Sequence, residues 1–158
     1  MSMTAVTTTG VPTNQLNDRW VFWYHSCISE DWSIEGYQKI METDTIRDFW
    51  IPMKTINDFS QGMYFLMRGN NLPIWESYTS KVLLVKYKTT KQAYHSLWQN
   101  LCIAAVAEAL GKDPTKVVGV SISPKHRNII ITIWIINSTA CPDLGPNLPF
   151  NIKDCITK

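Results

Sequence analysis

The sequence predicts an α+β fold in which helices pack on the convex face of a curved antiparallel β-sheet and leave a ligand slot on the concave face. The expected elements run in the order strand, helix, strand, strand, helix, hairpin. The chain has 158 residues, of which 45% are hydrophobic, and can therefore bury one sizeable core. A sheet that is covered on one side leaves its other face open to a ligand.

Five segments are rich in β-branched and aromatic residues, a composition typical of strands. The first contains Trp20 and Trp23, which we expect in the core together with Trp98 from a later helix. The last two flank a basic turn and predict an antiparallel hairpin. The segments are residues 19–24, 63–68, 81–87, 116–123 and 129–136.

Two segments have the apolar spacing of amphipathic helices. The shorter one covers residues 45–53, with Thr43 or Asp44 as its N-cap and with Pro52 expected to end or distort it. The longer one runs from about residue 90 to residue 110. We expect it to pack across the sheet.

The chain divides into a flexible arm (residues 1–14), one folded domain (residues 15–137) and an irregular, proline-containing tail (residues 138–158). The N-terminus lacks the features of a signal peptide, and no apolar run approaches the ~18 residues of a membrane span. The four cysteines show no metal-binding spacing. We expect reduced thiols in a cytoplasmic protein, with a Cys141–Cys155 disulfide as the alternative.

The segment Pro73-Ile74-Trp75-Glu76 places an indole beside a carboxylate just after a proline. An indole face can stack on a base, and a carboxylate can accept two hydrogen bonds from the N–H groups of guanine. A methyl group on N7 makes guanine cationic, and two flanking indoles then add roughly 0.5–2 kcal/mol of cation–π attraction per face. Trp32, in a polar loop, is the candidate for the second indole.

The charge pattern excludes some classes of function. A net charge of +2 is too small for general binding to duplex nucleic acid, so any nucleic-acid contact must be local. The three histidines are scattered, and no nucleophile, base and orienting group can be assembled by motif. We therefore expect a protein that is not an enzyme and has no catalytic residue, cofactor or metal site.

The chain resembles the eukaryotic translation initiation factor 4E family, whose members bind the 7-methylguanosine cap of messenger RNA. The resemblance covers residues 16–136 and depends on five segments in family order and at near-family spacing. The family fold is a curved antiparallel sheet backed by helices, like the one predicted. The segments are Arg19-Trp20 with Trp23, Asp48-Phe49-Trp50, Pro73-Ile74-Trp75-Glu76, the helix around Trp98, and Ile131-Thr132-Ile133-Trp134.

The resemblance implies a site for the cap base. Trp32 and Trp75 match the family's two stacking indoles, and Glu76 matches the carboxylate that reads guanine. Trp134 matches the indole that faces the N7 methyl group.

The resemblance also implies cations for the cap phosphates. Lys125 and Arg127, in the basic turn, and Lys81 match these family positions. Lys125 replaces a more usual arginine and therefore neutralises a phosphate without the bidentate fork of a guanidinium.

On its helix side the family receives a partner helix from the initiation scaffold protein or from 4E-binding repressors. Ile46, Trp50 and Ile103 are the expected docking residues, although Trp50 could instead pack between helix and sheet. Gln99 and Asn100 stand where leucine and glutamate are usual, which removes an apolar contact and an acceptor charge.

The resemblance therefore implies a monomeric cytoplasmic protein that binds capped mRNA and supports translation initiation, without contact to a membrane. Fewer residues follow Trp134 than in the family, so we expect weaker or differently shaped contact to the nucleotides after the cap. Two alternatives stay open. One is a repressor that sequesters caps without recruiting the scaffold, and the other is a protein-interaction module with a vestigial cap slot.

Overall fold

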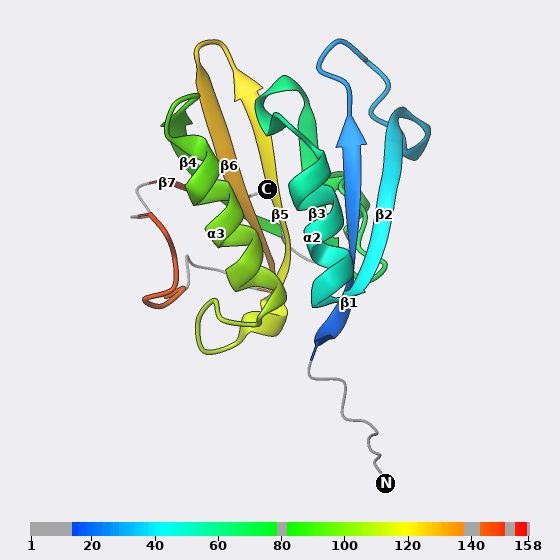
Figure 1. Cartoon of the computed structure of the whole chain (residues 1–158). Helices are drawn as coiled ribbons and strands as arrows, with labels where there is room; N and C mark the ends of the chain where they lie inside the picture. Colours follow the sequence, from blue (N-terminus) through cyan, green and yellow to red (C-terminus); the bar gives the residue numbers. More distant parts are fainter. Residues whose placement is uncertain (1–13, 79–81, 138–142, 151–153, 158) are drawn as a thin grey trace, which may run out of the picture.

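The computed structural model describes residues 14–78, 82–137, 143–150 and 154–157, the last stretch by its backbone alone. Its centre is a seven-stranded sheet in the order β2-β1-β3-β5-β6-β4-β7 (Figure 1). All neighbouring strands are antiparallel, as predicted. The strands are β1 (Gln15–His25), β2 (Tyr37–Thr45), β3 (Met63–Arg68), β4 (Val82–Thr90), β5 (Val117–Lys125), β6 (Asn128–Ile136) and β7 (Asp154–Thr157).

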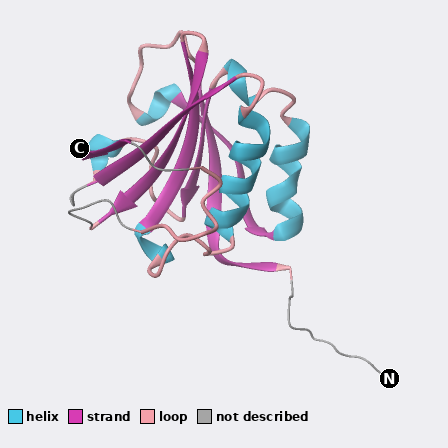
Figure 2. Ribbon diagram, turned by 90° about the vertical axis from the view of Figure 1, so that its left-hand side faces the viewer, coloured by secondary structure: helices cyan, strands magenta, loops and turns pink. Residues whose placement is uncertain are grey.

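Two helices, α2 (Ile46–Thr55) and α3 (Tyr94–Val106), lie side by side on one face of the curved sheet (Figures 1 and 2). This arrangement confirms the predicted α+β class. Short 3-10 turns connect several elements. They are η1 (Ile34–Gly36), η2 (Phe59–Gln61), η3 (Trp75–Ser77) and η4 (Pro114–Lys116).

Alternate residues of β1 point to opposite faces of the sheet, so this strand contributes to two hydrophobic clusters. Trp20 and Phe22 belong to the larger cluster under the helices, which also contains Trp98 of α3. Val21 and Trp23 belong to a smaller cluster on the open face. The predicted burial of Trp20, Trp23 and Trp98 is confirmed. The smaller cluster is the base on which the candidate site is built.

Helix α2 begins one residue later than predicted and ends later. Its N-cap is Thr45, whose Oγ1 accepts a hydrogen bond from the Asp48 N–H at 3.1 Å, rather than either of the two preceding residues. Pro52 does not end the helix, which continues to Thr55. A proline removes one backbone hydrogen bond, and here it lies buried among the residues that hold α2 on the sheet.

The two edge strands were not predicted. Strand β2 lies at one edge of the sheet, where it pairs with β1. Most of its side chains are exposed, so its sequence lacks the apolar alternation of a half-buried strand. At the other edge, β7 pairs with β4 within the tail that was expected to be irregular, so that prediction was wrong for residues 154–157. Residues 143–150 contain neither helix nor strand.

Some predictions fall outside the described residues. The N-terminal arm does so except for Asn14, as does Cys141 of the alternative disulfide. Cys27 and Cys102 are free thiols, exposed and buried respectively.

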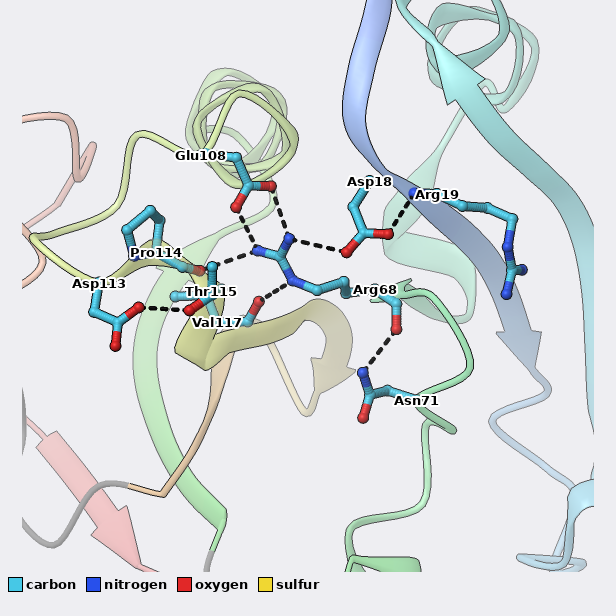
Figure 3. Close-up of polar contacts among 9 residues, drawn as sticks. All are labelled: Asp18, Arg19, Arg68, Asn71, Glu108, Asp113, Pro114, Thr115 and Val117. Atoms are coloured by element: carbon cyan, nitrogen blue, oxygen red, sulfur yellow. Dashed lines mark hydrogen bonds and ion pairs between the residues drawn. The ribbon is translucent and has the colours of Figure 1, made fainter.

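Helix α3 ends at Val106, before the predicted residue 110, because the chain turns at Glu108. The φ angle of Glu108 is 58°, in the left-handed region. A residue other than glycine in that region costs about 1–3 kcal/mol. The cost is offset by Arg68, whose guanidinium donates two hydrogen bonds to the Glu108 carboxylate, both at 2.8 Å (Figure 3).

Arg68, at the end of β3, contacts four further residues. Its guanidinium donates to the backbone oxygens of Val117 and Pro114, both at 3.0 Å, and forms an ion pair with Asp18 at 3.4 Å (Figure 3). It also lies over the ring of Trp20, 4.6 Å from the centroid. A buried cation with this many partners fixes the point from which the loop toward Trp75 departs.

Candidate functional site

A slot of about 390 Å³ lies on the open face of the sheet, over the smaller hydrophobic cluster. Residues far apart in the sequence line it, from the loop before η1, from the turn η3 and the loop before it, and from strands β2 to β6. The lining includes Trp32, Tyr37, Trp75, Glu76, Lys86, Ser121 and Trp134. The four residues predicted for the cap base are thus brought together, while the roles assigned to them stay predictions.

The first indole, Trp32, stands on the loop between β1 and η1 and is 51% exposed. Its ring stacks on the buried imidazole of His25, with the ring centroids 4.2 Å apart and the planes at 4°. The nitrogens of that imidazole are each 2.8 Å from a backbone carbonyl oxygen, of Ser26 and of Asp31. One face of the Trp32 ring is therefore covered by His25, and the loop is held at Ser26 and at Asp31.

The second indole, Trp75, opens the turn η3 and is 38% exposed. Two side-chain hydrogen bonds hold the segment between Arg68 and Tyr78 that contains it. The Asn71 side chain donates to the Arg68 carbonyl at 2.8 Å, and the Tyr78 hydroxyl donates to the Leu72 carbonyl at 2.8 Å. Exposed tryptophans on ordered loops are available for contact with a flat ligand.

The carboxylate of Glu76 stands at the rim beside Tyr37. Burial raises the pKa of Tyr37 to about 12, and the negative charge of Glu76 adds to the effect. Glu76 itself is exposed. A carboxylate in an indole-lined slot can accept hydrogen bonds from N–H groups on the edge of a ring held there.

The floor of the slot is polar and aromatic. Trp134 of β6 is 4% exposed, and its Nε1 donates to the Ser121 hydroxyl of β5 at 3.0 Å. The Trp134 ring makes an edge-type contact with the ring of Phe65, at 80°, and the ring of Tyr78 is tilted by 50° to it, each 6.2 Å away between centroids. Trp134 is thus fixed in the floor and contributes to the slot lining.

Two of the cations predicted for the phosphates lie outside the slot lining, and the role of all three stays a prediction. Lys125 and Arg127 are exposed at the β5–β6 turn and do not line the slot, and Lys81 lies outside the described residues. Lys125 is nevertheless on the slot side of β5, because Ser121 and Ser123 line the slot and side chains alternate along a strand.

Lys86 of β4, by contrast, is part of the slot lining and was not predicted. The signal was present in the sequence, since Val82 and Leu84 precede it at a spacing of two and belong to the smaller cluster. That spacing could have placed Lys86 on the ligand face once the face was known.

A second depression, of about 290 Å³, lies on the opposite side of the molecule between α2, α3 and the start of β1. It contains the three residues predicted for partner docking, Ile46, Trp50 and Ile103, with Ile46 43% exposed. Gln99 and Asn100 are not among its lining residues. We call this depression the helix-face groove.

Among the described residues no three His, Cys, Asp or Glu side chains gather where they could hold a metal ion. Neither α2 nor α3 has the length and apolar composition needed to cross a bilayer.

The fold and the slot define an α+β protein with an aromatic-walled binding site on the uncovered face of an antiparallel sheet. Residues 15–146 match the family model described as Eukaryotic initiation factor 4E. The chain belongs to the eukaryotic initiation factor 4E family, which consists of translation factors that bind mRNA caps and are not enzymes.

Two curated relatives come from Caenorhabditis elegans. Eukaryotic translation initiation factor 4E-5 is 22% identical over 162 residues, which cover 95% of this chain and 76% of the relative. Eukaryotic translation initiation factor 4E-1 is 24% identical over 144 residues, which cover 84% of this chain and 66% of the relative.

Solved structures of the same family have the same fold. One is the complex of C. elegans eIF4E-3 with the 4E-binding protein Mextli and a cap analog, with a TM-score of 0.71 and 19% identity over 80% of this chain and 76% of that one. Another is Ascaris suum eIF4E-3 with an m7G cap, with a TM-score of 0.69 and 20% identity over 80% of this chain and 75% of that one.

Proposed function

We propose that this protein binds the 7-methylguanosine 5′ cap of mRNA in the cytoplasm, stacks the methylated base between Trp32 and Trp75, and supports translation initiation. The observation that carries the proposal is that two exposed indoles, 43 positions apart in the sequence, line one slot together with Glu76. Family membership and the cap complexes of the neighbouring structures support the same ligand.

Each part of the slot has a chemical task in this proposal. The indoles attract a cationic base through their electron-rich faces, by roughly 0.5–2 kcal/mol per face. The Glu76 carboxylate accepts hydrogen bonds from guanine N1–H and N2–H₂, which adenine cannot offer in that arrangement. Trp134, in the floor, provides an apolar surface for the N7 methyl group.

The phosphates would extend from the slot toward the β5–β6 turn. Lys86 lies inside the slot, and Lys125 is on the same side of β5 four residues beyond Ser121. At about 3.3 Å per residue this path is long enough for a triphosphate. Lys125 and Arg127 would therefore meet the outer phosphates and Lys86 the inner ones.

Tryptophan fluorescence tests the proposal directly, because a stacked base quenches the indoles. We expect quenching by 7-methyl-GTP at concentrations at which unmethylated GTP has little effect, since the methyl group supplies the positive charge of the ring. Absence of quenching, or an equal response to both nucleotides, would reject the proposal.

A partner helix in the helix-face groove is a second proposal. It is favoured by the apolar lining that Ile46, Trp50 and Ile103 form on the helix side of the sheet. Calorimetry with a helical peptide from an initiation scaffold or a 4E-binding protein tests it. We expect Trp50→Ala to weaken binding and Ile51→Ala, an exposed residue of α2 outside the groove, to leave it unchanged.

The same experiment separates the alternatives. Cap binding with peptide binding supports a factor that recruits mRNA. Cap binding without peptide binding supports a protein that sequesters caps, and peptide binding without cap binding supports an interaction module with a vestigial slot.

A further inference from the structure

The imidazole of His25 has hydrogen-bond acceptors at both nitrogens. Its Nδ1 lies 2.8 Å from the Ser26 carbonyl oxygen and its Nε2 lies 2.8 Å from the Asp31 carbonyl oxygen. Carbonyl oxygens only accept hydrogen bonds, and a neutral imidazole has a single N–H to donate. In the neutral form one contact would set two lone pairs against each other in a side chain that is 0% exposed. The imidazolium, with two N–H groups, donates in both contacts.

These two hydrogen bonds control the orientation of Trp32. They tie the loop at Ser26, directly after His25, and at Asp31, directly before Trp32. The imidazole also lies flat under the indole, with centroids 4.2 Å apart and an angle of 4° between planes. The plane of Trp32, and the face that it presents to the slot, therefore depend on the position of one ring.

The charges around His25 are compatible with a positive ring. From the loop, Asp31 contributes a carboxylate whose pKa is lowered, mainly by hydrogen bonds from Ser33 and to a smaller degree by the charge of His25. From β2, Tyr37 lies 4.7 Å away between centroids and stays neutral, because burial raises its pKa to about 12. From β3, the paired residue Met63 is uncharged. The Asp31 carboxylate is thus a negative charge in the same loop that interacts favourably with an imidazolium at His25.

We propose that His25, as an imidazolium, is the positioning residue that holds Trp32 ready to stack, so that affinity for a methylated purine nucleotide rises when this histidine gains its proton. The proposal depends on the function proposed for the slot. It adds that the two indoles are held by different chemistry and that one of them responds to pH.

The test compares the wild type with His25→Phe, which keeps a stacked aromatic ring but has no N–H group. The affinity for 7-methyl-GTP is measured by calorimetry from about pH 6 to about pH 8.5, the range in which histidine ordinarily changes charge. Titration of the nucleotide affects both proteins equally and cancels in the ratio of their affinities. His95→Phe, an exposed histidine on α3, is the matched control.

We expect the wild type to bind about tenfold more tightly than His25→Phe near pH 6, which corresponds to ~1.4 kcal/mol. The advantage should fall to within about twofold near pH 8.5, whereas His95→Phe should follow the wild type throughout. If the ratio of the affinities of the wild type and His25→Phe does not change with pH, the proposal is overturned. A ring with a purely structural role would change the affinity by the same factor at every pH.

A second measurement does not require ligand. Imidazole-selective NMR of the wild type near pH 6 should show two N–H proton resonances for His25, protected by their hydrogen bonds, and none for the exposed His95. One resonance or none for His25 overturns the proposal. If neither protein binds 7-methyl-GTP, the function proposed for the slot fails, and the NMR result alone then supports or overturns the hydrogen-bonded imidazolium.

Discussion

The two loops that carry the exposed indoles are anchored by groups of different chemistry. The Trp32 loop is tied to the imidazole of His25, which is proposed to act as an imidazolium. The Trp75 loop starts at Arg68, which stays charged, and is closed by the Tyr78 hydroxyl. Burial raises the pKa of Tyr78, so this hydroxyl keeps its proton throughout the physiological range. In the role proposed for His25, the Trp32 wall responds to pH, whereas the Trp75 wall does not.

A binding slot can thus combine a fixed wall, here that of Trp75, with an adjustable one, here that of Trp32. The fixed wall also carries Glu76, the group that would read the base, and its orientation should be independent of pH. The adjustable wall carries only a stacking surface. Changes in pH should then alter affinity more than base preference.

The largest expected effect comes from breaking the anchor of the fixed wall. Arg68→Met removes a buried cation and leaves the Glu108 carboxylate, with its side chain 10% exposed, unpaired in a left-handed turn. We expect the free energy of unfolding to fall by about 3–5 kcal/mol in urea denaturation. Arg47→Met, at a side chain that is 82% exposed, is the control and should change stability little. A loss below about 1 kcal/mol for Arg68→Met would show that the cluster does not stabilise the fold.

The next effect concerns base recognition on the fixed wall. Glu76→Gln keeps the shape of the side chain but turns an amide N–H₂ toward the base. We expect affinity for 7-methyl-GTP to fall by about 1.5–3 kcal/mol, as for hydrogen bonds to a charged group. The preference of the protein for 7-methyl-GTP over 7-methyl-ATP should become smaller as well. Calorimetry with both nucleotides measures this, and an unchanged preference would remove Glu76 from the site.

Removing each indole in turn compares the two walls directly. Trp75→Ala should lower affinity by about 1–3 kcal/mol, the usual value for one stacked base. Trp32→Ala should cost less, because Trp32 is the more exposed of the two indoles, 51% against 38%, and a less enclosed ring contributes less to stacking. Calorimetry is the measurement, and Ile51→Ala, exposed on α2 away from the slot, is the control. A larger loss for Trp32→Ala would contradict the proposed difference between the walls.

The smallest effect comes from loosening the fixed wall. Tyr78→Phe removes the hydroxyl that donates to the Leu72 carbonyl at 2.8 Å. We expect a loss of stability of about 0.5–1.5 kcal/mol. The loss should be the same at pH 6 and at pH 8, since the pKa of Tyr78 is raised well above this range. Tyr87→Phe, whose ring stacks on Phe150 with centroids 4.4 Å apart, keeps that stack and serves as the comparison in thermal denaturation.

The central strands and the two helices could be predicted because their residues repeat with the period of the element. The β5–β6 hairpin is an example, since β-branched residues flank a basic turn. The edge strands could not be predicted, because β2 exposes most of its side chains and β7 is only four residues long. The end of α3 was missed because Glu108 occupies a position where glycine is usual, supported by an arginine 40 positions away.

The sequence by itself determined which chemistry was available: a tryptophan next to a glutamate after a proline, further tryptophans in family order, and an apolar face on each helix. These features are local, and local spacing is enough to see them. The tertiary structure alone decided that Lys86 enters the slot while Lys125 stays at the turn, and that His25 lies under Trp32. Such contacts depend on strand order and register, which bring distant residues to one face of the sheet and which no local pattern specifies.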